Sequence, residues 1–184
     1  FVGSESQDLQ AAVMVSDKYF LVSSLSVSVF HSHEHLYGEV GVGWSQRKKE
    51  RIVEIITGLG YGDSYSNGST FSLTSDVTYR ITGTYIRPYI QASIGFNGKY
   101  AGFGLASRIA YLHYWYNENT KTGARRGYGL FAEPAIFLRV GSVVAVEAQM
   151  GAAMLLFPIN SVTKELTPDF NPIRGSIGLH IIFR

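Results

Sequence analysis

Hydrophobic and polar residues alternate along most of the chain, most clearly over residues 85–97. Ile90 and Ile94 occupy one set of alternate positions there, while Arg87 and Gln91 occupy the other. A period of two places successive side chains on opposite faces of a β-strand. The pattern therefore predicts strands with one apolar face and one face of small, polar and charged residues.

The same alternation recurs along the chain. Strands are predicted over 1–4, 8–16, 19–30, 36–46, 51–62, 84–96, 100–116, 127–140, 143–157 and 172–183. The connections alternate in length. Tight ones are predicted at 16–19, 46–51, 97–99 and 141–142, an intermediate one at 31–35, and long polar ones at 63–83, 117–126 and 158–171. This alternation puts turns at one end of the strands and loops at the other.

Long alternating strands with turns at one end and loops at the other are typical of a transmembrane β-barrel. The sequence thus predicts one all-β domain over residues 1–184, a transmembrane antiparallel up-and-down barrel of about ten strands, with about eight or twelve as other counts. A soluble β-sandwich is the alternative fold. It is disfavoured because the second face carries mostly Gly, Ala, Ser and isolated Glu or Arg, which suits a narrow polar lumen.

Aromatic residues are frequent: 12 Tyr, 11 Phe and 2 Trp. Many lie near predicted strand ends, as in the aromatic belts of membrane proteins. On the turn side these are Phe20, Trp44, Phe96, Tyr100 and Phe183, and on the loop side Phe30, Tyr61, Tyr85, Trp115, Tyr128 and Phe157. The sequence therefore predicts two interfacial girdles.

Composition removes several function classes. The 16 basic and 14 acidic residues are interspersed and give a net charge of +2, which argues against a nucleic-acid partner. With no cysteine, the chain has no disulfide or thiolate metal site, and no apolar run is long enough for a spanning helix. The first ten residues lack the features of a signal peptide, so we expect a processed or truncated N-terminus.

Three segments carry a family resemblance: 35–44, 85–96 and 107–112. They resemble small outer-membrane β-barrel proteins of the Bacteroidota, many of which are lipoproteins of unassigned function. The resemblance implies a bacterial outer-membrane location and a lipidated cysteine upstream of the residues given. It implies no chemistry, because the shared motifs are strand patterns.

Charged and amide side chains gather on the face predicted to line the lumen. They are Glu39, Glu54, Arg87, Gln91, Arg108, Glu133, Arg139, Glu147, Gln149, Arg174 and His180. An isolated ion in a low-dielectric interior loses hydration at a cost of several kcal/mol, so such groups must pair or stay wet. We expect Arg–Glu pairs that fill the lumen; a selective pore or a small-anion site is the alternative.

Loop residues offer little catalytic chemistry. His31, His33 and His35 could bind a divalent metal weakly, although no residue beyond Glu34 is evident that would orient their rings. Ser32 next to these histidines gives only a faint hydrolase pattern. No cofactor is expected.

Two basic clusters lie in predicted connections. Residues 47–51 could meet periplasmic anions, and Lys121, Arg125 and Arg126 could meet lipopolysaccharide phosphates. The expected function is a non-enzymatic, structural or accessory outer-membrane barrel, a subunit of a larger outer-membrane complex, with outer-membrane lipid, lipopolysaccharide and other outer-membrane proteins as partners. A narrow channel for small solutes or ions is the second hypothesis, and a loop-borne metal or lipid-modifying enzyme the third.

Overall fold

The protein is all-β in a computed structural model, which describes residues 7–30, 33–70, 77–98, 100–118, 125–141, 144–158 and 173–181. Its strands are β1 (Gln7–Met14), β2 (Tyr19–Phe30), β3 (His33–Lys48), β4 (Arg51–Thr70), β5 (Val77–Asn97), β6 (Ala101–Glu118), β7 (Arg125–Gly141), β8 (Val144–Ala152), β9 (Met154–Pro158) and β10 (Ile173–Ile181). These described residues contain no helix that could cross a membrane.

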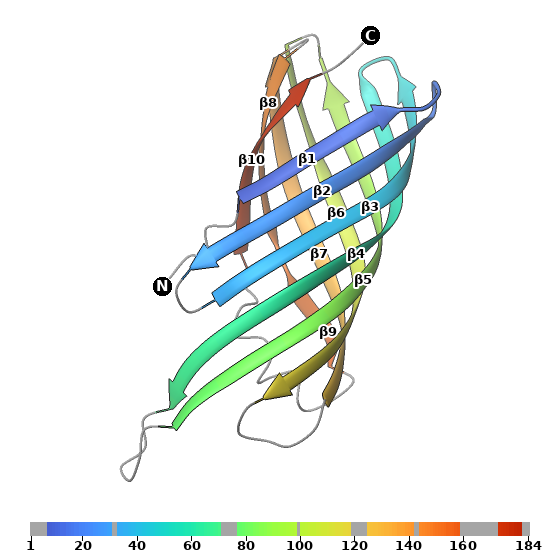
Figure 1. The fold of residues 1–184 in the computed structure, drawn as a ribbon. Helices are drawn as coiled ribbons and strands as arrows, with labels where there is room; N and C mark the ends of the chain where they lie inside the picture. The colour runs from blue at the N-terminus through green and yellow to red at the C-terminus, as the bar shows by residue number, and fades with distance from the viewer. Residues whose placement is uncertain are drawn as a thin grey trace.

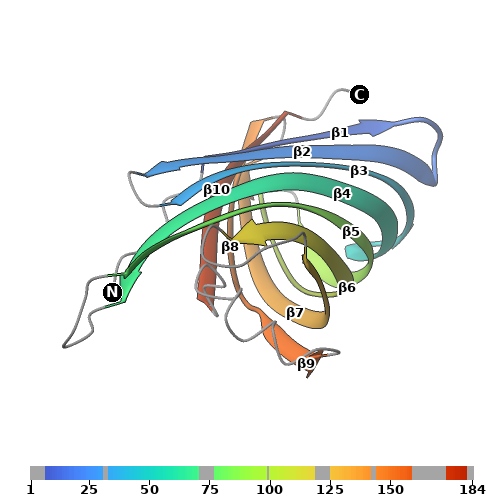
Figure 2. The same cartoon turned by 60° about the horizontal axis from the view of Figure 1, so that its bottom comes forward.

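All strands belong to one antiparallel up-and-down sheet. Its order is β1-β2-β3-β4-β5-β6-β7-β8-β10, and β9 pairs with β7. Short turns such as that between β3 and β4 lie at the top of Figure 1, which we call the turn end; the opposite end is the loop end. Figure 2 shows the sheet curling around an interior. The predicted antiparallel all-β architecture is confirmed.

Closure of the sheet into a barrel would require β1 and β10, the strands at its two edges, to pair with each other. β1 and β10 come close to each other, but no ladder joins them in the part of the chain that the structure describes. Both strands run toward the turn end (Figure 1), because every other strand along the order has the same direction. The two ends of the sheet are therefore parallel neighbours rather than an antiparallel pair.

Several strand limits differ from the prediction. The long loop expected over 63–83 is wrong, because β4 and β5 continue through most of it as one ladder, including the pairs Tyr65↔Thr82 and Asn67↔Arg80. On β4 the extension is polar on both faces and shows no hydrophobic alternation, but on β5 Val77, Tyr79 and Ile81 alternate with polar residues and do indicate a strand. Threonine and tyrosine nevertheless favour strands, and adjacent chains can keep pairing beyond the apolar region.

The strand expected over 143–157 is interrupted at Ala153. β8 pairs with both β7 and β10, whereas β9 pairs with β7 in the same register as β8, with Gly151 opposite Ala135 and Met154 opposite Ala132. A register shift between Leu130 and Phe131 falls inside β9, beyond Leu155, and such a bulge bends a strand near its end. The strand expected over 1–4 lies outside the described residues.

The predicted two faces of the strands are confirmed by exposure. On β5 and β6 the outward side chains Ile90 and Phe103 are 53% and 62% exposed, while the inward residues Tyr89 and Ala110 are 4% and 0% exposed. Leu138 on β7 is likewise 53% exposed. The large apolar side chains thus cover the outside of the curled sheet instead of forming its core.

Among the expected girdle residues whose side chains the structure describes, two are on the wrong side. Phe20 and Tyr85 are buried, at 7% and 5% exposure, because they share the alternation of inward-facing residues. Trp44 and Tyr61 do lie on the outer side, in step with exposed Val42 and Leu59. Strand-end position alone therefore does not identify a girdle residue; its place in the alternation must agree.

Glycines on the inner face give room for these buried rings. A Cβ added at Gly62 would lie 2.5 Å from the Tyr85 ring, and one added at Gly60 would collide with Tyr37. Gly43 is covered in the same way by Phe20. Each ring therefore packs directly on backbone, and the glycines of 58–62 serve ring packing rather than phosphate binding.

Candidate functional site

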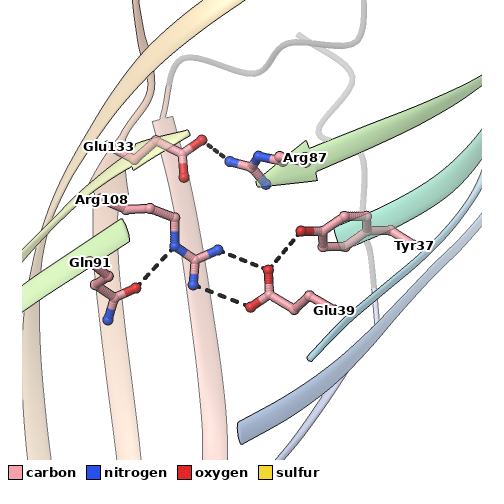
Figure 3. Close-up of polar contacts among 6 residues, drawn as sticks. All are labelled: Tyr37, Glu39, Arg87, Gln91, Arg108 and Glu133. Carbon is pink, nitrogen blue, oxygen red and sulfur yellow. Dashed lines mark hydrogen bonds and ion pairs between the residues drawn. The ribbon is translucent and has the colours of Figure 1, made fainter. Parts of the chain in front are cut away.

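The inward-facing polar side chains converge on Glu39 of β3 (Figure 3). Its carboxylate accepts a hydrogen bond of 2.6 Å from the Tyr37 hydroxyl and two from the Arg108 guanidinium, at 3.0 and 3.2 Å. Both carboxylate oxygens are thus engaged by one arginine, an arrangement that adds directional specificity to charge attraction. Glu39 is therefore held in one position by groups from two strands.

Arg108 of β6 is fixed by its other neighbours. Its Nε donates to Gln91 Oε1 at 3.0 Å, and its guanidinium lies 4.1 Å from the centre of the Tyr89 ring. Gln91 and Tyr89 both come from β5, the neighbour of β6. Each guanidinium nitrogen thus donates to a described acceptor, which leaves Arg108 committed to the protein.

A second ion pair joins Arg87 of β5 to Glu133 of β7 (Figure 3). Arg87 is buried, at 8% exposure, and also faces the Tyr37 ring at 5.8 Å from its centre. A buried arginine requires such compensation because losing its hydration is costly. Glu133 and the Tyr37 ring therefore compensate Arg87 for the hydration that it loses on burial.

Neither ion pair connects neighbouring strands. Arg108–Glu39 joins β6 to β3, with β4 and β5 between them in the sheet, and Arg87–Glu133 joins β5 to β7 across β6. Side chains can meet across intervening strands only where the sheet is strongly curved. The two ion pairs therefore stabilise the curvature of the sheet, and we call them cross-braces.

An aromatic layer lies beside the ion pairs toward the loop end. Tyr37 stacks on Tyr85 with ring centres 5.8 Å apart, and Tyr85 contacts Tyr114 at 5.0 Å. Leu112 and Phe131 complete this buried cluster. Side chains from β3, β5, β6 and β7 thus meet inside the curled sheet and fill it.

The remaining predicted lumen residues are spread toward the turn end. Glu54 accepts a 3.1 Å hydrogen bond from Ser93, and Glu54 and Arg139 line a cavity of about 20 Å³. A cavity of this size holds about one water molecule. The interior here is polar but offers little open volume.

Other predicted site residues are placed only by their strands. Gln149 lies half-buried on β8, and Glu147 stands opposite Arg139 in the β7–β8 ladder. The side chains of Glu147, Arg174 and His180 lie outside the described residues. So do His31 and the side chains of His33 and His35.

Tyr37, Tyr85 and Tyr89 were not predicted as site residues. Tyr37 and Tyr89 contact the charged groups and Tyr85 stacks on Tyr37, but tyrosine on a strand is commonly assigned to packing or to a membrane belt. The sequence did indicate which way these side chains face, because Tyr85 and Tyr89 occupy the same alternate positions as Arg87 and therefore share its face of the strand. Tyr37 likewise alternates in step with Glu39.

Comparisons with protein-family models, with curated proteins and with solved structures found no match to this chain.

Proposed function

We propose that the protein is a non-enzymatic β-barrel of the bacterial outer membrane, of the kind found in the Bacteroidota, with a structural or accessory role. The observation that carries this proposal is the inverted distribution of residues. Large apolar side chains such as Val40, at 65% exposure, cover the outside, while ion pairs lie within. Hydrocarbon outside and polar groups inside are what a spanning barrel requires.

Strand length supports the same proposal. β3 to β7 contain 16, 20, 21, 18 and 17 residues, whereas a tilted strand needs about 9–11 residues to cross the hydrocarbon core. The excess leaves polar extensions beyond the apolar zone, such as the β4–β5 ladder past Asp63. An open sheet edge is not tolerated in lipid, so the proposal includes closure of the sheet along β1 and β10.

A plugged lumen is the form of barrel that the interior favours. The cross-braces and the layer of Tyr37, Tyr85, Leu112 and Phe131 occupy the space that a pore would need. No arginine of these braces is left to attract a solute. We therefore propose that the barrel serves lipid contact and assembly with other outer-membrane proteins rather than transport.

Reconstitution tests the proposal. Purified protein should float with lipid vesicles and, in planar bilayers, should give no steady single-channel conductance. Failure to insert would refute the membrane assignment. Insertion accompanied by steady conductance would instead favour the second hypothesis, a narrow channel for small solutes or ions.

A further inference from the structure

The hairpin between β3 and β4 places two cations directly opposite each other. Lys48 and Arg51 are register partners and lie on the outer side, in step with exposed Val42 and Val53. Like charges in this position destabilise a strand pair. Neither cation, nor Lys49 in the turn, forms an ion pair with Glu50 or any other described residue.

Aromatic rings adjoin this charged pair on the same outer face. Arg51 is the register partner of Phe96, which is in turn the partner of Phe103. The two rings stack with centres 5.7 Å apart, and Phe103 is 62% exposed. The exposed rings of Phe96 and Phe103 therefore lie directly beside the two cations; we call these two rings the apolar collar.

A hollow in the apolar surface begins one outward residue further toward the loop end. It measures about 770 Å³, and Val53, Ile94 and Leu105 line it next to the collar. Ala92, Ser107 and Pro134 line the same hollow; Ala92 and Pro134 are both register partners of Ser107. Small residues on successive strands, bordered by large ones, produce this depression.

We propose that this surface is a binding site for a phospholipid with an anionic headgroup. Lys48 and Arg51 bind the phosphate, the rings of Phe96 and Phe103 contact the glycerol region, and an acyl chain fills the hollow. From Arg51 on β4 to Ser107 on β6 the path covers ~10 Å across the strands and ~13 Å along them, within reach of one acyl chain. A phosphate also relieves the repulsion between the two cations.

The proposal rests on membrane insertion, the first part of the proposed function, and goes beyond it by naming a lipid class and a site. Because short turns of outer-membrane barrels face the periplasm, the ligand belongs to the inner leaflet. A soluble acidic peptide would account for the cations but would not use the adjoining apolar hollow.

Lipid selectivity is tested with the full chain carrying Trp115→Phe, which leaves Trp44 at the turn end as the only tryptophan. Brominated phosphatidylglycerol should quench Trp44 at lower mole fraction than brominated phosphatidylcholine. Lys48→Gln and Arg51→Gln should each reduce this preference about fivefold. Ala92→Phe, which fills the hollow and leaves all charges, should weaken quenching by both lipids.

Stability gives a second readout, in which the effect of Lys48→Gln changes sign with the lipid. In phosphatidylcholine vesicles Lys48→Gln should raise the urea midpoint, because it removes repulsion; in phosphatidylglycerol vesicles it should lower the midpoint. Lys18→Gln, which removes an exposed cation of the neighbouring β1–β2 turn, controls for general attraction to an anionic surface and should show no such reversal.

Protein that inserts into vesicles but shows equal quenching by the two lipids, or no reversal with Lys48→Gln, would overturn the site while leaving the proposed function intact. If Lys18→Gln reduced the preference for phosphatidylglycerol equally, that preference would reflect general attraction to an anionic surface and not a site at Lys48 and Arg51. Stabilisation by inorganic phosphate alone, to the level reached with phosphatidylglycerol, would overturn the role of the hollow. Protein that does not float with vesicles refutes the proposed function itself.

Discussion

Removing Glu39 should destabilise the protein chiefly by leaving Arg108 uncompensated. The pair is bidentate, at 3.0 and 3.2 Å, and the side chains of Arg108 and Glu39 are 21% and 9% exposed. Breaking a buried pair by removing one partner costs ~3–5 kcal/mol. Because Arg108 keeps Gln91 as an acceptor and retains some solvent contact, we expect the lower end for Glu39→Ala, ~3 kcal/mol.

The matched variant replaces both charges. Glu39→Leu combined with Arg108→Met keeps much of the volume and leaves no unpaired ion, but it removes the acceptor of Tyr37 and the donor to Gln91, so we expect a cost of ~1–2 kcal/mol. Glu50→Ala, at an exposed turn, should change stability by less than ~0.5 kcal/mol. Comparing Glu39→Leu alone with the double variant separates the cost of an unpaired charge from the cost of lost packing.

Urea unfolding in lipid vesicles, followed by tryptophan fluorescence, measures these free energies where unfolding is reversible. The decisive quantity is the non-additivity of the single replacements Glu39→Leu and Arg108→Met. If the double variant were destabilised by the sum of its single variants, the two groups would not be energetically coupled. The assignment of the pair as a brace across β4 and β5 would then be wrong.

Three further predictions concern other parts of the chain. Ile90→Arg and Leu138→Arg, on the outer face, should each cost ~2–4 kcal/mol in vesicles, whereas Asn117→Arg, on the same face near the loop end, should cost under ~1 kcal/mol; equal costs in refolding titrations would refute the placement of Ile90 and Leu138 in the hydrocarbon core. Gly60→Ala should cost ~1–3 kcal/mol through collision with Tyr37, while Gly38→Ala, whose Cβ would have no neighbour closer than 3.8 Å, should be tolerated; a well-tolerated Gly60→Ala would contradict the ring packing. Zinc should bind His31, His33 and His35 only weakly in calorimetric titration, and submicromolar affinity lost on replacing all three by alanine would make that loop a functional centre.

Strand facing could be predicted because it depends only on local alternation. Ile90 and Gln91 take opposite sides of β5 whatever the sheet does elsewhere. The same rule would have placed Phe20 and Tyr85 inside, had alternation been given precedence over their position near strand ends. The extension of β4 carried no hydrophobic periodicity, so its limits depend on backbone pairing that the pattern does not record, whereas the extension of β5 was indicated by the alternation of Val77, Tyr79 and Ile81 with polar residues.

Choice of partner within the lumen could not be predicted from the sequence. Gln91 and Arg108 are cross-strand neighbours, which a correct hairpin register would reveal. Glu39 reaches Arg108 only because β4 and β5 between them curve, and curvature arises from the whole sheet. Sequence alternation can therefore identify which charges face inward, but not which of them meet.

The glycines of β4 have a consequence for folding. A slip of β3 against β4 by two residues would keep every side chain on its face, but it would move Tyr37 from Gly60 to Gly58 or Gly62, which the Tyr89 and Tyr85 rings already cover. That slip would move Glu39 by ~7 Å relative to Arg108 and separate their charges. Ring packing and the ion pair thus favour the same alignment, so both act as checks on register while the hairpin assembles.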